Sequence, residues 1–213
     1  WKQLNDWMGQ ALEATFRTER DQKLADQLQL TNIQKELHWL RKDVVPSNAQ
    51  TAFCHNDVLA ANVILEEDEE EKKGDHPLHL IDFEYGGVNF VGFDIANHLN
   101  EFGGGTDIPT GIPNYEWLPS RQFQRLFVKN YLSAGGGGGG EEEEPSGDDD
   151  DEEIEAMLSE VQAFTLVNHL YWGLWAVNQA ATEGCDEFDY IVYATHRIKQ
   201  YYKSKAETAT NPA

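Results

Sequence analysis

The chain has 213 residues, of which 40% are hydrophobic, and it carries a formal net charge of −22. That length and apolar content suffice for a folded domain with a buried core, while the strong negative charge argues against a nucleic-acid partner. No apolar run approaches the roughly 20 residues that span a bilayer, and two cysteines are too few for a disulfide framework, so we expect a cytoplasmic protein.

The first 45 residues are predicted to be helical, because their apolar residues recur at helical spacing. One face carries Leu4, Trp7, Met8, Leu12 and Phe16, and a later face carries Ile33, Leu37 and Leu40. Pro46 follows, and proline is common just past the end of a helix. We therefore expect the first helices to end before Pro46.

Three short apolar segments then predict β-strands at residues 51–54, 62–65 and 78–81. The last two would pair as a hairpin, because the run that joins them is charged and rich in turn-forming residues, which belong at an exposed tip. Hairpin pairing brings Asn62, at the start of one strand, to the same end of the ribbon as Asp82, which follows the other. Two polar side chains far apart in sequence are thus expected to lie together.

The order of Asp57, Asn62 and Asp82 matches the catalytic loop and metal-binding aspartate of kinase-fold phosphotransferases. Asp57, with an ordinary carboxyl pKa of about 3.9, would orient an acceptor hydroxyl and take its proton. Asn62 and Asp82 offer the oxygen ligands that Mg²⁺ prefers. The tripeptide formed by residues 55–57 is by itself more typical of a turn, and its combination with Asn62, the flanking strands and Asp82 favours catalysis.

The second half of the chain is predicted to be mainly helical. One helix follows Pro119 and Ser120, and a longer one spans residues 154–181, with apolar residues at helical spacing. Residues 134–155 combine polyglycine with clustered Glu and Asp, which cannot bury enough apolar surface to offset the cost of ordering. We therefore expect a disordered insert at 134–155.

Two aromatic pairs lie near the C-terminus. Trp172 and Trp175 are three residues apart, and Tyr190 and Tyr193 repeat that spacing on the next predicted helix, so each pair shares a helical face. Two antiparallel helices could present these four rings to one pocket, where aromatic faces would attract a small cation. The alternative is core packing, which is the commoner role of aromatic residues at helical spacing.

These segments together resemble the choline/ethanolamine kinase family. The resemblance rests on residues 54–62 (CHNDVLAAN), 81–85 (IDFEY) and 93–102 (FDIANHLNEF), and on the aromatic segments 170–176 and 188–194. It implies an α+β, protein-kinase-like fold in which residues 1–213 form a mainly helical C-terminal lobe around a small β-hairpin. It also implies ATP and Mg²⁺ as cofactors.

The resemblance extends to individual residues. Asp57 resembles the catalytic base, Asn62 and Asp82 resemble the metal ligands, and His55 and Asp94 are interpreted as residues that support the loop. The implied amino-alcohol site consists of Tyr85, Glu101, Trp172, Trp175, Tyr190 and Tyr193. The implied reaction is phosphorylation of ethanolamine or choline, the first step toward phospholipids with those headgroups.

The two amino alcohols make different demands on such a site. The quaternary ammonium of choline needs an aromatic cage, whereas the primary ammonium of ethanolamine has three donors and needs acceptors such as Glu101. The segments 57–59 and 100–103 are closer to ethanolamine kinases, while Tyr190 is closer to choline kinases, so ethanolamine is slightly favoured. Relatives usually carry an aromatic residue where this chain has Gly103–Thr106, so one wall of the site is expected to be missing or mobile.

Two features leave other interpretations open. No glycine-rich strand-loop-strand and no strand lysine precede Asp57, although a kinase needs both, and the chain begins at Trp1 rather than methionine. We therefore expect it to lack the N-terminal lobe and to turn over little substrate alone. A non-catalytic binding module is one alternative, and an aminoglycoside or protein kinase relative is another. The residues indicate no oligomeric state.

Overall fold

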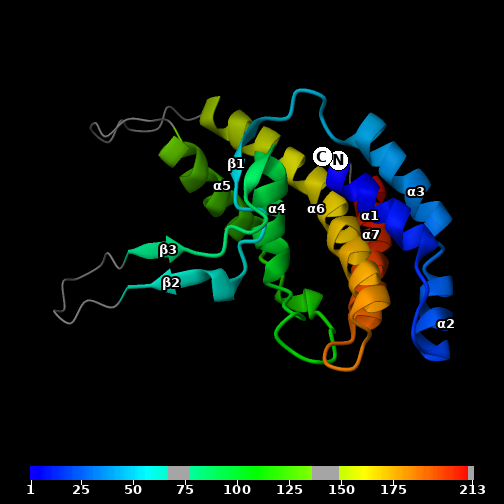
Figure 1. Ribbon diagram of the computed structural model, residues 1–213. Helices are drawn as coiled ribbons and strands as arrows, with labels where there is room; N and C mark the ends of the chain where they lie inside the picture. Colours follow the sequence, from blue (N-terminus) through cyan, green and yellow to red (C-terminus); the bar gives the residue numbers. More distant parts are fainter. Residues whose placement is uncertain (67–76, 136–148, 211–213) are drawn as a thin grey trace.

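The computed structural model describes residues 1–66, 77–135 and 149–210 (Figure 1). At its centre is the long helix α6 (Asp149–Thr182), which contacts helices α1, α3, α4, α5 and α7. Apolar residues are buried around most of the circumference of α6, among them Leu158, Phe164, Leu170, Leu174 and Val177. A helix that is apolar on all sides belongs in the interior, and here it forms the core on which the other elements pack.

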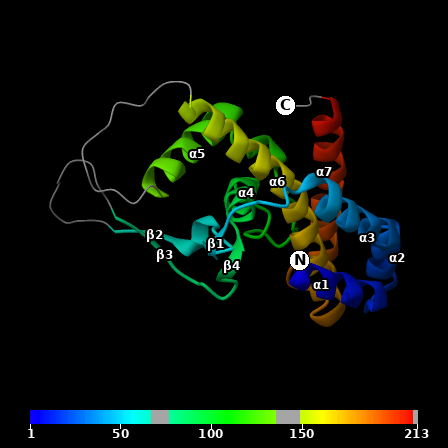
Figure 2. The same cartoon turned by 90° about the horizontal axis from the view of Figure 1, so that it is seen from above.

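The N-terminal region folds into helices α1 (Lys2–Glu13), α2 (Glu19–Gln27) and α3 (Leu30–Trp39), followed by a π-helical turn at Leu40–Val44. The prediction that these helices end before Pro46 is confirmed. Of the residues on the predicted α1 face, Leu12 is 42% exposed, and the smaller Ala11 is buried beside Leu4 and Met8. Both views place these helices on one side of the molecule and the strands and α5 on the other (Figures 1 and 2).

Four short strands form two antiparallel ribbons. Strand β1 (Thr51–Cys54) pairs with β4 (Gly87–Phe90), and β2 (Val63–Leu65) pairs with β3 (Leu78–Leu80). The predicted hairpin is therefore present, with Val63 opposite Leu80, while β4 is a strand that the sequence patterns did not indicate. The predicted hairpin tip falls mostly on residues 67–76, which lie outside the described residues.

Helix α4 (Val91–Glu101) follows β4 directly, and α5 (Arg121–Gly135) precedes α6. The predicted disordered insert at 134–155 was too wide, because α5 continues to Gly135 and α6 begins at Asp149. The acidic residues Asp151, Glu152 and Glu153 are compatible with the first turns of a helix, where negative charge is favourable. Arg125 also pairs with Asp151 at 2.5 Å, and Arg121 pairs with Glu155 at 2.6 Å. Residues 136–148 lie outside the described residues.

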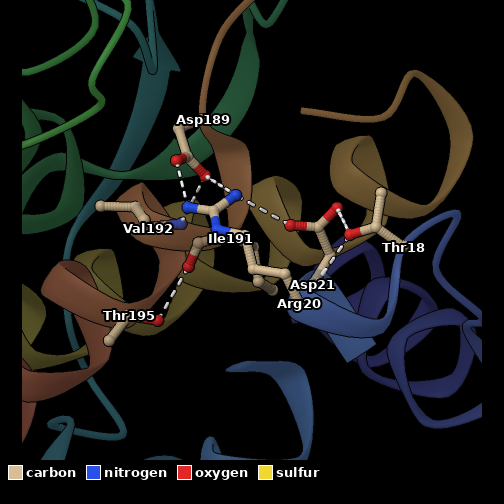
Figure 3. A network of polar contacts seen from close by, with 7 residues as sticks. All are labelled: Thr18, Arg20, Asp21, Asp189, Ile191, Val192 and Thr195. Carbon is tan, nitrogen blue, oxygen red and sulfur yellow. Dashed lines mark hydrogen bonds and ion pairs between the residues drawn. The ribbon is translucent and has the colours of Figure 1, made fainter. Parts of the chain in front are cut away.

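The start of α7 (Tyr190–Thr210) is joined to α2 by a polar network (Figure 3). The two guanidinium nitrogens of Arg20 contact Asp21 at 2.9 Å and Asp189 at 2.5 Å. Asp189 also accepts a hydrogen bond from the backbone N–H of Val192, and Thr18 accepts one from the N–H of Asp21. Each helix thus has a side-chain acceptor at its first turn, and the link fixes the end of α7 that carries Tyr190.

Candidate active site

The loop after β1 is held rigidly by α4 and by the neighbouring strands. The backbone N–H groups of His55 and Asn56 donate to the two carboxylate oxygens of Asp94, at 2.9 and 2.7 Å. His55 is buried and its Nε2 atom donates to the backbone oxygen of Ile81 at 2.8 Å, while Nδ1 faces the N–H of Asp57 at 3.3 Å. These contacts fix the backbone on both sides of Asp57.

Positive backbone φ angles occur at Asn56 (67°) and at Asp82 (62°). Asn and Asp adopt this left-handed conformation more readily than other residues with side chains. The Asn56 side chain donates to the backbone oxygen of Tyr85 at 2.8 Å and accepts from Asn89 at 2.7 Å, which ties the loop to the segment after Asp82. The two turns that present Asp57 and Asp82 are therefore fixed relative to each other.

The structure brings Asp57, Asn62 and Asp82 together at one end of the β2–β3 ribbon. The side-chain amide of Asn62 donates to the backbone oxygen of Asp57 at 2.9 Å. The N–H of Ile81 donates to the backbone oxygen of Asn62 at 3.0 Å, which places Asp82 one residue beyond the pairing. Asn62 is buried, whereas Asp82 is exposed. The predicted convergence of these residues is thus seen in the backbone pairing.

Burial, together with the negative charges of Glu101, Asp82 and Glu84, raises the pKa of Asp57 to about 7, while His55 opposes the shift. The ordinary carboxyl pKa expected from the sequence was therefore wrong. A carboxylate that loses water and faces like charges is harder to ionise. The local motif could not show the burial of Asp57 or its acidic neighbours Asp82, Glu84 and Glu101, because these residues come from separate segments of the chain.

We expect Asp57→Asn to stabilise the chain at alkaline pH. The folded carboxyl titrates near pH 7 and the unfolded one near 3.8, so the destabilisation by ionised Asp57 grows between those values and is complete above pH 7. The variant should exceed the original chain in free energy of unfolding by roughly 1 to 3 kcal/mol at pH 8, and by less at pH 5. Urea unfolding in EDTA measures this difference. Asp26→Asn, on the exposed face of α2, is the control, and an equal difference at both pH values would contradict the expectation.

A chain of aromatic rings starts beside the loop and runs to α7. The ring centroids of Tyr85 and Trp172 are 5.4 Å apart, those of Trp172 and Trp175 are 5.5 Å apart, and those of Trp175 and Tyr190 are 5.6 Å apart. Trp175 and Tyr190 are half-buried, whereas Trp172 is buried. The structure therefore brings these four predicted rings into one continuous group from three segments of the chain.

Tyr193 is placed differently from the other predicted rings. Only 1% of it is exposed, its ring centroid lies 5.9 Å from that of Phe188, and its hydroxyl accepts a hydrogen bond from Arg197 at 3.2 Å. Tyr193 thus packs in the core behind the exposed rings, and a role in contact with substrate stays a prediction for this residue. The spacing of three that it shares with Tyr190 does not give the two rings equal exposure.

Glu101, the last residue of α4, faces a cation that the sequence patterns did not single out. Its side chain is 8% exposed, and its carboxylate lies 3.5 Å from the guanidinium of Arg197, which is 1% exposed. Burial raises the pKa of Glu101, and the charge of Arg197 opposes that shift. The one available signal for Arg197 was its position four residues after Tyr193 on the same helix, where side chains are neighbours.

The loop after α4 contains Tyr115, another aromatic residue that the sequence patterns did not indicate. A β-carbon at Gly103 would lie 3.4 Å from the Tyr115 ring, an ordinary van der Waals contact, so Gly103 and Tyr115 are direct neighbours. The Tyr115 ring also packs edge-on against His169 of α6, with centroids 5.6 Å apart. Tyr115 therefore lies beside the segment Gly103–Thr106, where the sequence predicted a missing or mobile wall.

Comparison with known proteins identifies the family. The sequence profile described as choline/ethanolamine kinase matches residues 1–202. The chain belongs to the choline/ethanolamine kinase family. It is 36% identical over 175 residues to ethanolamine kinase 1 of Mus musculus, covering 82% of this chain and 44% of that protein. It is also 36% identical over 208 residues to a probable ethanolamine kinase of Arabidopsis thaliana, covering 98% and 50%.

The fold agrees with membership of the choline/ethanolamine kinase family. The solved structure of Plasmodium vivax ethanolamine kinase superposes with a TM-score of 0.72 at 23% identity, covering 94% of this chain and 48% of that one. This likeness confirms the predicted helix-rich, kinase-like lobe with small β-ribbons. The chain spans about half the length of the curated family members that it matches.

Proposed function

We propose that this chain carries the catalytic centre of an ATP-dependent phosphotransferase that phosphorylates the hydroxyl group of ethanolamine or choline. The convergence of Asp57, Asn62 and Asp82 at one end of the β2–β3 ribbon, with the aromatic group starting at Tyr85, supports this proposal. Several relatives bear the name ethanolamine kinase. Nothing in the comparisons favours the alternative of a non-catalytic binding module.

Asp57 would act on the acceptor hydroxyl. Its carboxylate would accept a hydrogen bond from that hydroxyl, hold the oxygen in line with the terminal phosphate and take the proton as the bond to phosphorus forms. A base with a pKa of about 7 suits this role, because proton transfer is most efficient when the pKa lies near the working pH. The rigid loop around His55 and Asn56 would keep the carboxylate in position.

Asn62 and Asp82 fit the ligand set of Mg²⁺. Because Asn62 uses its amide nitrogen to bond the backbone oxygen of Asp57, its Oδ1 atom is the end of the side chain that can coordinate. Asp82 adds a carboxylate that is exposed at the same end of the ribbon. Mg²⁺ accepts one or two such protein ligands together with phosphate oxygens. When bound, it would neutralise charge on the transferred phosphoryl group.

One face of the β2–β3 ribbon fits the adenine ring of ATP. Ile64 lies opposite His79 in the register, and Ile81 follows two residues later on the same face. Ile64 is 46% exposed and Ile81 is 41% exposed; Ile64 lies two residues after Asn62, and Ile81 directly precedes Asp82. We propose that these two side chains form an apolar floor beneath the base.

The aromatic group and Glu101 would bind the amino alcohol. Tyr85, Trp175 and Tyr190 are half-buried, so their ring faces can attract an ammonium group, each contributing roughly 0.5 to 2 kcal/mol. Asp57 feels the charge of Glu101, so a substrate ammonium near Glu101 leaves its hydroxyl close to the base. Ethanolamine is our preferred substrate, since the family members of highest identity reported above are named for it.

Trp175→Ala is expected to raise the KM for choline by about 2- to 30-fold, the equivalent of one cation–π contact. The KM for ATP should stay within about twofold, because the ring belongs to the substrate side of the site. Trp175→Phe should recover part of the loss. Trp39→Ala, which removes a tryptophan at the end of α3 that contacts Lys205, serves as the matched control. An unchanged KM for choline would show that Trp175 is a packing residue.

A coupled assay with Mg²⁺, ATP and either amino alcohol tests the proposed function, in the natural full-length protein and in this 213-residue chain separately. We expect turnover in the full-length protein and far less in the chain alone. Absence of phosphorylation of both amino alcohols by the full-length protein would refute the function. The ratio of kcat/KM values for ethanolamine and choline decides the preference.

The setting of this reaction is also a proposal. None of the described helices is long and apolar enough to cross a membrane. Cys54 and Cys185 are both free thiols, which suits a reducing compartment. We propose that the protein acts in the cytoplasm and that its phosphorylated product supplies the synthesis of phospholipid headgroups. Fractionation of cells followed by immunoblotting would test the location.

A further inference from the structure

Arg197 lies in the interior of the molecule, directly behind the proposed amino-alcohol site. It is 1% exposed, on the second turn of α7, and it contacts two other helices. Its Nη2 atom donates a hydrogen bond to the side-chain oxygen of Asn168 on α6 at 2.5 Å. Its Nη1 atom donates a hydrogen bond to the hydroxyl of Tyr193, and the same atom lies 3.5 Å from the carboxylate of Glu101 on α4. One guanidinium therefore links the three helices that bear the predicted substrate-binding residues.

A second branch of buried hydrogen bonds leads from Asn168 to the aromatic group. The Asn168 amide donates to Asn97 at 2.7 Å, and Asn97 accepts another hydrogen bond from the indole N–H of Trp172 at 2.6 Å. Asn100 also donates to Asn168, at 2.8 Å. Trp172 is thus linked to Arg197 only indirectly, through Asn97 and Asn168, whereas Glu101 has Arg197 as a direct charged neighbour.

Buried charges are stable when they are paired and hydrogen-bonded, and removal of one partner leaves the other unfavourably buried. The two terminal nitrogens of Arg197 meet this condition, because they reach Asn168, Tyr193 and the neighbourhood of Glu101 at once, while the Nε atom has no hydrogen-bond partner among the described residues. A lysine has a single ammonium on a flexible stem and cannot hold the same three neighbours in one plane. The geometry therefore specifies arginine at this position.

We propose that Arg197 is a positioning residue that keeps the Glu101 carboxylate directed toward the ammonium group of the substrate. This inference rests on the proposed function and assigns a role to a residue outside the predicted site. It has a consequence for selectivity. Ethanolamine offers N–H donors to an oriented carboxylate, whereas choline has none and depends on the aromatic rings. Arg197 therefore favours ethanolamine.

Arg197→Met in the natural full-length protein provides the test. The KM for ethanolamine should rise roughly 10- to 100-fold, as when a group that orients a ligand is removed, while the KM for choline rises less and the KM for ATP stays within about twofold. Arg197→Lys should give an intermediate KM for ethanolamine. An unchanged or lower KM for ethanolamine, or equal increases for both amino alcohols, would overturn the proposal.

A double variant separates action through Glu101 from a general effect on the fold. If Arg197 acts through Glu101, Glu101→Gln combined with Arg197→Met should raise the KM for ethanolamine no more than the more affected single variant does. Fully additive increases would contradict the proposal. Lys205→Met, which breaks the pair with Glu36 two turns further along α7, is the matched control and should leave both KM values within about twofold.

Two outcomes remain interpretable if a variant is unstable or inactive. If circular dichroism shows that Arg197→Met is unfolded, Arg197→Lys decides the proposal. Its KM for ethanolamine should then rise more than its KM for choline, and equal increases would overturn the proposal. If the unmodified full-length protein phosphorylates neither amino alcohol, the proposed function fails. An active unmodified protein whose selectivity is insensitive to Arg197 defeats the positioning role alone.

Discussion

Asp57→Asn is expected to lower the kcat of the natural full-length protein by about 10²- to 10⁴-fold, the usual contribution of a positioned general base. The amide has nearly the same shape as the carboxylate but cannot take the proton of the acceptor hydroxyl. The loop is fixed by hydrogen bonds from the backbone N–H groups of His55 and Asn56 to Asp94, and by one from the His55 ring to the backbone oxygen of Ile81. The loop backbone should therefore not move in the variant. Steady-state kinetics with Mg²⁺, ATP and ethanolamine measure the loss.

The pattern of the loss distinguishes a chemical role from a binding role. The KM for ATP should change by less than about threefold, because Asp57 is assigned to the acceptor and not to the nucleotide. Asp26→Asn, an identical change on the exposed face of α2, should retain the original rate. If Asp57→Asn kept more than a tenth of the original kcat, another group would have to serve as the base.

The sequence predicted the β2–β3 ribbon well, because its signals are local. The strands next to Asn62 and Asp82 could be predicted from short apolar segments and a charged connection between them. The two residues could be placed together because a hairpin brings its two outer ends to the same place. Strand β4 was missed because Gly87–Phe90 is only four residues long and contains a glycine, an asparagine and one β-branched residue. It becomes a strand by pairing with β1, which is a tertiary effect.

The electrostatics of the site could not be predicted from the motif. The raised pKa of Asp57 depends on burial and on Glu101, which lies 44 positions later on α4. Arg197 is similar, since a lone arginine on a helix is normally solvated, and only the packing of α4, α6 and α7 puts it beside Glu101. Helical spacing likewise grouped Tyr193 with Tyr190 but could not show that its ring lies in the core.

Asp82→Asn is expected to lower kcat/KM for ATP by roughly 10²- to 10³-fold, comparable to the loss of one electrostatic stabiliser at a developing charge. The half-saturating Mg²⁺ concentration should also rise, because an amide oxygen is a weaker ligand than a carboxylate for this cation. Asp82 has a left-handed backbone, which asparagine also tolerates, so the turn should persist in the variant. Initial rates measured across a series of Mg²⁺ concentrations test both effects.

The metal dependence is what assigns Asp82 a ligand role. Excess Mg²⁺ should recover part of the activity of Asp82→Asn, whereas it should recover none in Asp57→Asn, whose defect lies in proton transfer. Asp6→Asn, an exposed aspartate on α1, controls for the loss of one negative charge from a strongly acidic chain. Asp82→Asn could instead show the original Mg²⁺ dependence and only a lower kcat. In that case the Asp82 carboxylate of the unmodified protein acts through the charge it places near Asp57, and other groups must hold the ion.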